Sequence, residues 1–184
     1  MALTLIKETG AGLANANAYA DVADGDAYHE GHLYASAWTG ATTASKTAAL
    51  VMATRLIDAE YQFNGLRSLA VQALQWPRVN CPDPDKSPAS LLTGLLLADP
   101  FVSASVVPNA LGLATCELAR ELLIADRTAA PAGEGLSYQN VGGNQTGYDK
   151  NDTRPIISAV AQAMLAKYGS LLKSKSGAVK LVRA

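Results

Sequence analysis

Few residues of this chain have types and spacings that could do chemistry, and the clearest are two histidines. His29 and His32 lie three positions apart with Asp26 and Glu30 nearby, so one helix face could offer metal ligands. Gly31 separates the histidines and no second cluster follows, which favours a polar helix end. The signatures of serine hydrolases, zinc proteases and P-loop nucleotide-binding proteins do not occur. We therefore expect no catalytic residue, no metal and no cofactor, and a protein that is not an enzyme.

The most informative segment for binding is Leu74-Gln75-Trp76-Pro77-Arg78. Pro77 fixes its own φ and favours an extended conformation for Trp76, and Arg78 adds a planar fork of donors. An aromatic ring and an arginine on a stiff segment are typical of a docking surface. A tryptophan that closes the core is the alternative, so the sequence leaves Trp76 as either a core or an interface residue.

Nucleic-acid binding would need aromatic residues interleaved with basic ones. Tyr61, Phe63, Arg67, Trp76 and Arg78 come closest to that description. The net charge of −1 argues against a dedicated DNA-binding protein. The favoured interpretation places Tyr61 and Phe63 in the core at a helix end, with Arg67 and Arg78 at the surface.

The composition indicates a domain with an unusually weakly charged surface. Hydrophobic residues make up 49% of the 184 residues and charged residues 17%, against about 25% charged in ordinary domains. Such a surface fits a subunit that is buried on several sides in an assembly. The isolated Cys81 and Cys116 have no paired spacing, and no secretory or membrane-spanning stretch is recognisable. We expect reduced, partly buried thiols in an intracellular protein.

The charges are distributed unevenly along the chain. Acids gather at Asp21, Asp24, Asp26 and Glu30, whereas residues 166–184 contain five basic residues and no acid. Opposed ends of this kind suit head-to-tail contacts between subunits, or an acidic or nucleic-acid partner for the tail.

The elements that must position these residues are mainly helical. Apolar spacing predicts helices over about 43–61, from 108 to about 128–131, and from 154 to about 169. A shorter helix is expected from a cap at Asn17 to Gly31, after a brief strand or extended arm at 3–7. The expected buried faces are Leu50, Ala53, Ile57 and Tyr61; Leu111, Thr115, Leu118, Leu122 and Ala125; and Ile156, Val160, Ala163 and Met164.

Other stretches interrupt the helical pattern. Prolines make residues 82–88 a loop, and the apolar run 91–97 is either a helical turn or a buried strand. Five glycines in 133–150 predict a protruding hairpin or mobile loop. We predict a mainly α fold, a bundle of three to four helices with this projection and extended terminal arms. Residues 1–173 form one domain, and 174–184 form a basic tail that could add a strand to an acceptor edge.

Three pieces of the chain resemble a known family. They are Glu8-Thr9-Gly10-Ala11-Gly12-Leu13-Ala14-Asn15-Ala16-Asn17-Ala18-Tyr19, Ala53-Thr54-Arg55-Leu56-Ile57-Asp58 and Leu74-Gln75-Trp76-Pro77-Arg78. They are similar to small proteins encoded among the head genes of tailed bacteriophages. These proteins are often labelled DnaT-like single-stranded-DNA-binding, while their gene neighbourhood and similarity to head–tail adaptors imply a connector role.

The resemblance implies a mostly helical subunit that forms a ring, usually of twelve copies, beneath the portal. The implied partners are copies of the chain, the portal protein, a tail-completion or stopper protein and packaged DNA in the channel, with no membrane. The protein would be made in the host cytoplasm and lie in the virion neck, where it extends the DNA channel and docks the tail. The tail residues expected to bind the portal are Lys175, Lys180, Leu181, Val182 and Arg183.

Two other functions are weighed against the adaptor. The alternative is a DnaT-like accessory protein that binds single-stranded DNA through Arg67, Trp76 and Arg78. A small hydrolase is the third, and no arrangement of residues in the sequence supports it.

Overall fold

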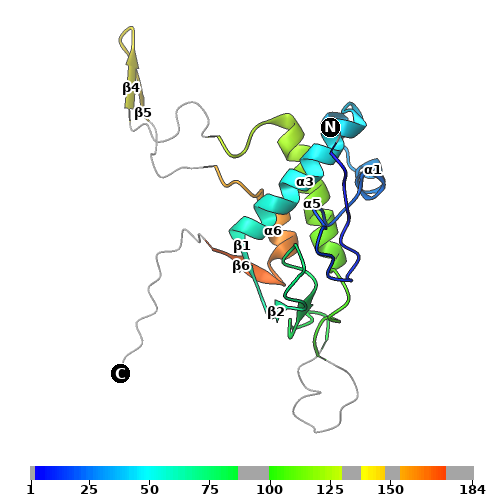
Figure 1. The fold of residues 1–184 in the computed structure, drawn as a ribbon. Helices are drawn as coiled ribbons and strands as arrows, with labels where there is room; N and C mark the ends of the chain where they lie inside the picture. Colours follow the sequence, from blue (N-terminus) through cyan, green and yellow to red (C-terminus); the bar gives the residue numbers. More distant parts are fainter. Residues whose placement is uncertain (1–2, 87–99, 130–137, 148–153, 173–184) are drawn as a thin grey trace, which may run out of the picture.

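The computed structural model describes residues 3–86, 100–129, 138–147 and 154–172. Two long helices form its centre, α3 (Thr43–Glu60) and α5 (Asn109–Ile124), which pack against each other. Helix α6 (Ala159–Leu165) packs on α5, and the short helices α1 (Val22–Glu30) and α2 (Ser36–Thr39) also contact α5 (Figure 1). The core lies where α3, α5 and α6 meet.

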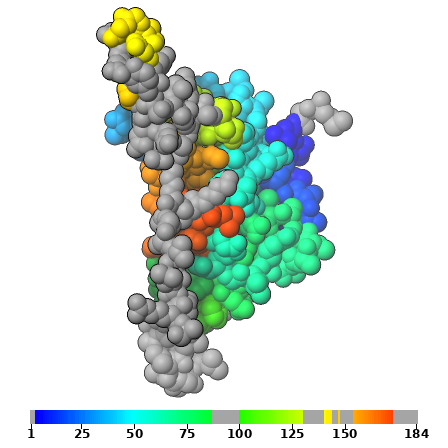
Figure 2. Space-filling view, turned by 90° about the vertical axis from the view of Figure 1, so that its left-hand side faces the viewer, coloured from blue at the N-terminus to red at the C-terminus, as the bar shows by residue number. Residues whose placement is uncertain are grey.

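Short strands complete the body in antiparallel pairs. Strand β1 (Tyr61–Phe63) pairs with β6 (Gly169–Leu171), and β2 (Leu66–Arg67) pairs with β3 (Arg78–Val79). The third pair is the hairpin of β4 (Tyr138–Val141) and β5 (Asn144–Gly147), joined at Gly142-Gly143. This hairpin falls within the predicted Gly-rich projection and lies apart from the helices in Figure 1. Figure 2 shows α6 and the N-terminal segment on opposite sides of the body.

The predicted bundle of three to four helices is wrong. The described residues form a mixed α/β fold of five helices and three two-stranded antiparallel pairs. Two of these helices have four and seven residues, too short to span a bundle. Strands and irregular segments take their place: β1 and the segment around Trp76 supply side chains to the hydrophobic core. The tail 174–184 and the apolar run 91–97 lie outside the described residues.

Helix α3 follows the predicted pattern closely. Thr42 caps it by accepting a hydrogen bond from the Ser45 backbone nitrogen, and the chain becomes extended at Tyr61. Leu50, Ala53 and Ile57 are buried as predicted. The long apolar face explains this agreement, because packing and helical period favour the same residues.

The ends of the other helices differ from the prediction. Helix α1 is capped by Asp21 in a reciprocal arrangement with Asp24, while the Asn17 side chain instead bonds the Ile6 nitrogen and the Thr4 carbonyl. Helix α5 ends at Ile124, several residues earlier than predicted.

The last helix is shorter than predicted and turned differently. It begins after Ser158, which caps it, and does not include Arg154 or Pro155. Ala161 and Leu165 are buried, whereas Val160 and Ala163, expected on the buried face, are exposed. In so short a helix, the contact with α5 sets the buried face.

A glycine inside α1 allows a close helix contact. Gly25 is buried, and a Cβ at this position would lie 2.3 Å from the ring of Trp38. Trp38 is itself fully buried and donates from its indole nitrogen to Asp26 at 2.8 Å. Gly25 therefore allows α1 to lie directly on the Trp38 ring.

Candidate functional site

The three sequence pieces that carry the family resemblance meet at one buried place. The Tyr19 hydroxyl donates to Asp58 Oδ1 at 2.6 Å and accepts from the Trp76 backbone nitrogen at 3.2 Å. The Gln75 backbone nitrogen donates to Asp58 Oδ2 at 3.0 Å. These bonds join the N-terminal segment, α3 and the segment before β3. The spacing in sequence gave no sign of this network.

Burial dominates the titration of this network. It raises the pKa of Asp58 to about 6, although the hydrogen bonds from Tyr19 and Gln75 act in the opposite direction. It also raises the pKa of Tyr19 well above its usual value, so the phenol stays protonated and remains a donor. The network is a structural junction, and it has no free nucleophile.

Glu8 shapes the N-terminal loop. Its buried carboxylate accepts hydrogen bonds from the backbone nitrogens of Gly10, Gly12 and Leu13 at 2.8, 2.9 and 2.8 Å. Gly10 has φ +100°, and a Cβ there would lie 2.0 Å from the Ser105 carbonyl oxygen. The Glu-x-Gly-x-Gly spacing thus folds a tight loop around one carboxylate and holds it against residue 105.

Trp76 and Arg78, predicted as interface or nucleic-acid residues, lie inside the protein. Trp76 is fully buried and packs edge-on against the rings of Phe63 and Tyr168. Arg78 is 4% exposed. Its guanidinium donates to the carbonyl oxygens of four residues: Phe63, Asn64, Gly65 and Gln75. Trp76 is therefore a core residue in this fold, and Arg78 ties the β1–β2 turn to the segment before β3.

Arg67 is the one residue of that predicted set at the surface. It is exposed, and its guanidinium donates to the Gln72 carbonyl oxygen. The Gln72 side chain is buried and donates to the carbonyl oxygens of Leu74 and Pro77. The structure therefore does not bring Arg67, Trp76 and Arg78 together on a surface.

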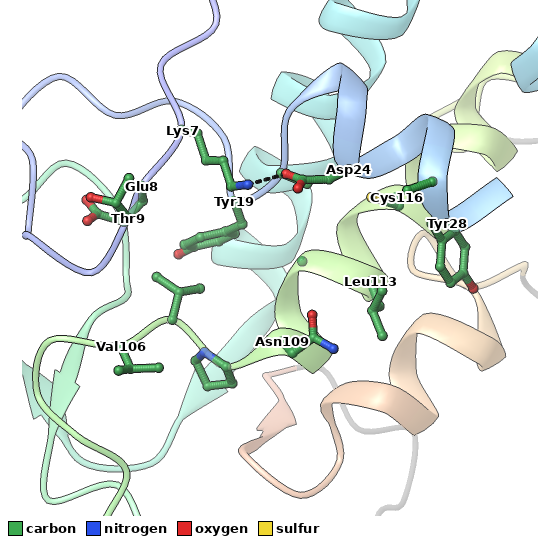
Figure 3. Close-up of a pocket in the computed structure, with 15 residues that line it drawn as sticks. Lys7, Glu8, Thr9, Tyr19, Asp24, Tyr28, Val106, Asn109, Leu113 and Cys116 are labelled. Carbon is green, nitrogen blue, oxygen red and sulfur yellow. Dashed lines mark ion pairs between the residues drawn. The ribbon is translucent and has the colours of Figure 1, made fainter. Parts of the chain in front are cut away.

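A groove lies between the N-terminal segment, α1 and the start of α5 (Figure 3). Its volume is about 650 Å³, and an ion pair between Lys7 and Asp24 crosses its wall. Burial raises the pKa of the Cys116 thiol in its lining to about 12, so this thiol is neutral. Glu8 and Tyr19 are engaged in the bonds described above. The described lining therefore offers no pair of nucleophile and base.

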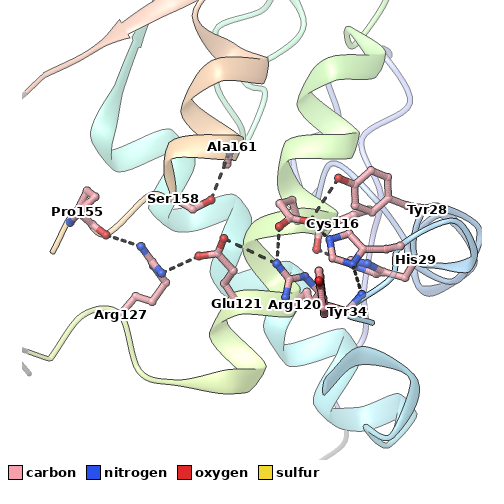
Figure 4. A network of polar contacts seen from close by, with 12 residues as sticks. Tyr28, His29, Tyr34, Cys116, Arg120, Glu121, Arg127, Pro155, Ser158 and Ala161 are labelled. Carbon is pink, nitrogen blue, oxygen red and sulfur yellow. Dashed lines mark hydrogen bonds and ion pairs between the residues drawn. The ribbon is translucent and has the colours of Figure 1, made fainter. Parts of the chain in front are cut away.

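A second polar network joins α1 to α5 and the chain before α6 (Figure 4). Glu117 is buried and contacts the Tyr28 hydroxyl at 3.3 Å and Arg120 at 2.5 Å. His32 Nε2 lies 3.7 Å from the Glu117 carboxylate. His29 bonds the Cys116 carbonyl oxygen through Nε2, and burial lowers its pKa. The described residues contain no group of three or more side chains suited to a metal ion.

Most cations of the described part of the chain already have partners. Nine of its ten lysines and arginines contact a carboxylate or a backbone carbonyl oxygen. These nine are Lys7, Lys46, Arg67, Arg78, Lys86, Arg120, Arg127, Arg154 and Lys167. Arg55 is the cation in this part of the chain for which no such contact is found. The predicted portal-binding residues Lys175, Lys180, Leu181, Val182 and Arg183 lie outside the described residues.

Several large apolar side chains, by contrast, are exposed. Leu66, Leu69, Val71 and Val106 are 66, 47, 70 and 45% exposed. They come from adjacent segments, because Ser68 donates to the Ala104 carbonyl oxygen at 2.9 Å. We call these four residues the β2 patch.

None of the helices described is long and apolar enough to cross a bilayer.

Comparison with known proteins gives a single kind of match. The sequence model of one family, described as "Putative DnaT-like ssDNA binding protein", matches residues 3–184. Neither the curated proteins nor the solved structures give a match. The description agrees with the alternative function of the sequence analysis more closely than with the adaptor. Because the match covers nearly the whole chain, the protein belongs to this DnaT-like family.

Proposed function

We propose that the protein is a non-enzymatic head–tail adaptor of a tailed phage. Its copies assemble in a ring under the portal, extend the DNA channel and give the tail a docking surface. The observation that supports this proposal is the contrast at the described surface between engaged cations and exposed apolar side chains. Such a surface favours contacts with other proteins over contacts with a polyanion.

The β2 patch supplies one such contact surface. Monomeric proteins rarely leave several large apolar side chains exposed side by side. Here Leu66, Leu69 and Val71 lie within six positions of each other, and Val106 belongs to the adjoining segment. The Glu8 loop supports this end of the molecule, because Gly12 lies against Leu69 and Gly10 against Ser105. The Glu8 loop thus holds the β2 patch in place, and this apolar patch suits contact with a protein partner.

Sedimentation of the purified chain, alone and mixed with the portal ring of the same particle, tests the proposal. We expect the chain to co-sediment with the portal in a fixed ratio. Leu66→Ser combined with Val71→Ser should weaken this association, whereas Ile124→Ser, an equally exposed apolar residue on α5, should leave it unchanged. A chain that remains a monomer and does not co-sediment with the portal would overturn the adaptor proposal.

Single-stranded DNA binding is the second candidate, favoured by the description of the family. In the described residues, Arg55 is the unengaged cation and Tyr34, at 76% exposure, the prominent exposed aromatic ring. The further cations it would need are those of the tail, Lys175, Lys180 and Arg183, with Lys173 directly before it. Fluorescence anisotropy with a labelled oligonucleotide at low and high salt tests it.

The two candidates give opposite results in this assay. A DNA-binding protein should lose affinity steeply as salt rises, and a chain ending at Ser174 should lose most of it. An adaptor that acts through protein contacts should bind the oligonucleotide weakly while it retains its affinity for the portal.

A further inference from the structure

The most exposed apolar side chains of the described chain lie between α1 and α2. Leu33 is 93% exposed and Tyr34 is 76% exposed. We call these two residues the knob. Apolar side chains of this size do not stabilise the monomer while they are exposed to water. A partner that covers them would gain the free energy of their burial.

The base of the knob is fixed although its tip is exposed. The Tyr34 backbone nitrogen donates to His32 Nδ1 at 3.0 Å, and the other ring nitrogen of His32 faces the buried Glu117. The neighbouring His29 lies 4.9 Å from the Trp38 ring and bonds α5. A loop held in this way loses little conformational entropy when it binds.

An apolar pocket lies on a different face of the molecule. It has a volume of about 370 Å³ and is lined by Leu3, Ala48, Val51, Met52, Arg55 and Leu56. We call it the socket. Leu50, Ala53 and Ile57 direct the opposite face of α3 into the core, so the socket lies on the outer side of α3, beside the N-terminal segment. The knob, in contrast, is fastened to α5.

The charges beside the two surfaces are complementary. Arg55, in the wall of the socket, is exposed and has no partner among the described residues. Glu30, three positions before Leu33, is exposed and forms no ion pair within the described chain. Each surface thus pairs apolar side chains with one uncompensated charge, and the two charges have opposite signs.

We propose that the knob of one copy of the chain docks in the socket of a second copy, with Glu30 meeting Arg55. The contact is heterologous, because two different faces of the same chain meet. Each copy then keeps one free knob or socket, and repetition of the contact gives a ring if the rotation closes. The inference deepens the proposed function, since an adaptor ring needs a repeating contact of this kind.

Cysteine cross-linking of the purified chain tests the contact directly. Chains carrying Leu33→Cys are mixed with chains carrying Met52→Cys, and a copper catalyst with oxygen oxidises two thiols to one disulfide. The native Cys81 and Cys116 are buried, so they contribute little background. We expect linked dimers in the mixture and few in either variant alone, because a heterologous contact brings position 33 to position 52.

A charge exchange provides the second measurement. Glu30→Arg and Arg55→Glu should each weaken self-association roughly tenfold in sedimentation equilibrium, and the chain with both changes should recover most of the loss. Lys167→Glu, at an exposed cation outside both surfaces, is the matched control and should have little effect. Circular dichroism confirms that each variant is folded.

The outcomes separate this contact from the adaptor proposal, because neither experiment contains the portal. Cross-linking in the mixture no stronger than in the single variants, or no recovery in the double charge variant, overturns the knob-and-socket contact. Self-association without portal binding would leave the contact standing and overturn the adaptor role.

Discussion

At the scale of single residues, Glu8 has the most sharply defined structural role. Its carboxylate is 1% exposed and satisfies three backbone nitrogens of one loop. A buried charge is tolerable here because each of its hydrogen bonds is charge-assisted. Removing it leaves three donors without a partner.

Glu8→Ala should lower the free energy of unfolding by about 3 kcal/mol, because unsatisfied buried donors are costly. Glu8→Gln keeps an acceptor for Gly10 and Gly12 but turns an amide donor towards Leu13, so we expect a loss of about 1–2 kcal/mol. Urea unfolding followed by circular dichroism measures both. Asp85→Asn, at an exposed carboxylate, is the control. Equal stability of Glu8→Ala and the wild type would contradict this role.

Asp58 predicts a pH dependence of stability. Its pKa in the folded protein, about 6, is above its ordinary value of 3.8, so the folded state binds more protons than the unfolded state between these values. Its contribution therefore favours folding at about pH 4 and is lost as the pH rises through about 6, by up to about 3 kcal/mol.

The difference in unfolding free energy between wild type and Asp58→Asn isolates this contribution. We expect the wild type to lose stability relative to the variant as the pH rises from about 4 to about 7. Tyr19→Phe, which removes the phenol that bonds Asp58, should be less stable than the wild type by about 1–3 kcal/mol. Parallel pH profiles for wild type and Asp58→Asn would show that Asp58 does not titrate in this range.

At the scale of elements, the contact between α1 and Trp38 makes glycine more favourable than alanine at one position inside a helix. Alanine normally stabilises a helix interior by about 1 kcal/mol relative to glycine. At position 25 the added Cβ would lie 2.3 Å from the Trp38 ring. Gly25→Ala should therefore lower the free energy of unfolding by about 1–3 kcal/mol.

Thermal unfolding of Gly25→Ala and Gly31→Ala tests this element. Gly31 ends the same helix with φ −88° and has open space around the position of a Cβ, so its replacement should change stability by less than about 0.5 kcal/mol. A stabilised Gly25→Ala variant would mean that α1 can move away from Trp38 without loss.

Comparison of two helices shows what a local pattern can predict. In α3, the predicted Leu50, Ala53 and Ile57 are buried, because 18 residues present a continuous apolar face. In α6, with seven residues, the predicted Val160 is exposed and Ala161 is buried in its place. Alanine-rich sequence around this short helix gives two faces of similar apolarity, so the contact with α5 selects between them.

At the scale of the whole molecule, the tail is expected to bind the portal. A chain ending at Ser174 loses Lys175, Lys180 and Arg183 together with Leu181 and Val182. We expect this truncation to weaken portal binding at least roughly tenfold, because it removes both charge and strand-forming residues.

Self-association serves as the internal control for this truncation. Sedimentation of the truncated chain alone should match that of the full chain, since the knob and the socket belong to the retained residues. Unchanged portal affinity would exclude a role of the tail in this contact.

The sequence by itself determined the DnaT-like family and the long helix α3, and it predicted a protruding hairpin or mobile loop where the Gly-rich hairpin lies. These features depend on order and spacing along the chain: a family match over residues 3–184, a helical period sustained over many turns, and glycines between short polar segments. The sequence also singled out Trp76 and Arg78, but it left Trp76 as either a core or an interface residue and favoured a surface position for Arg78.

Only the tertiary structure decided what those residues do. Trp76 is kept from water because distant residues such as Phe63 and Tyr168 pack against its ring. The partners of Arg78 are carbonyl oxygens up to 15 positions away in the sequence. The bond between Tyr19 and Asp58 joins residues 39 positions apart. Burial and pairing of this kind arise when distant segments pack together, and no periodicity along the chain encodes them.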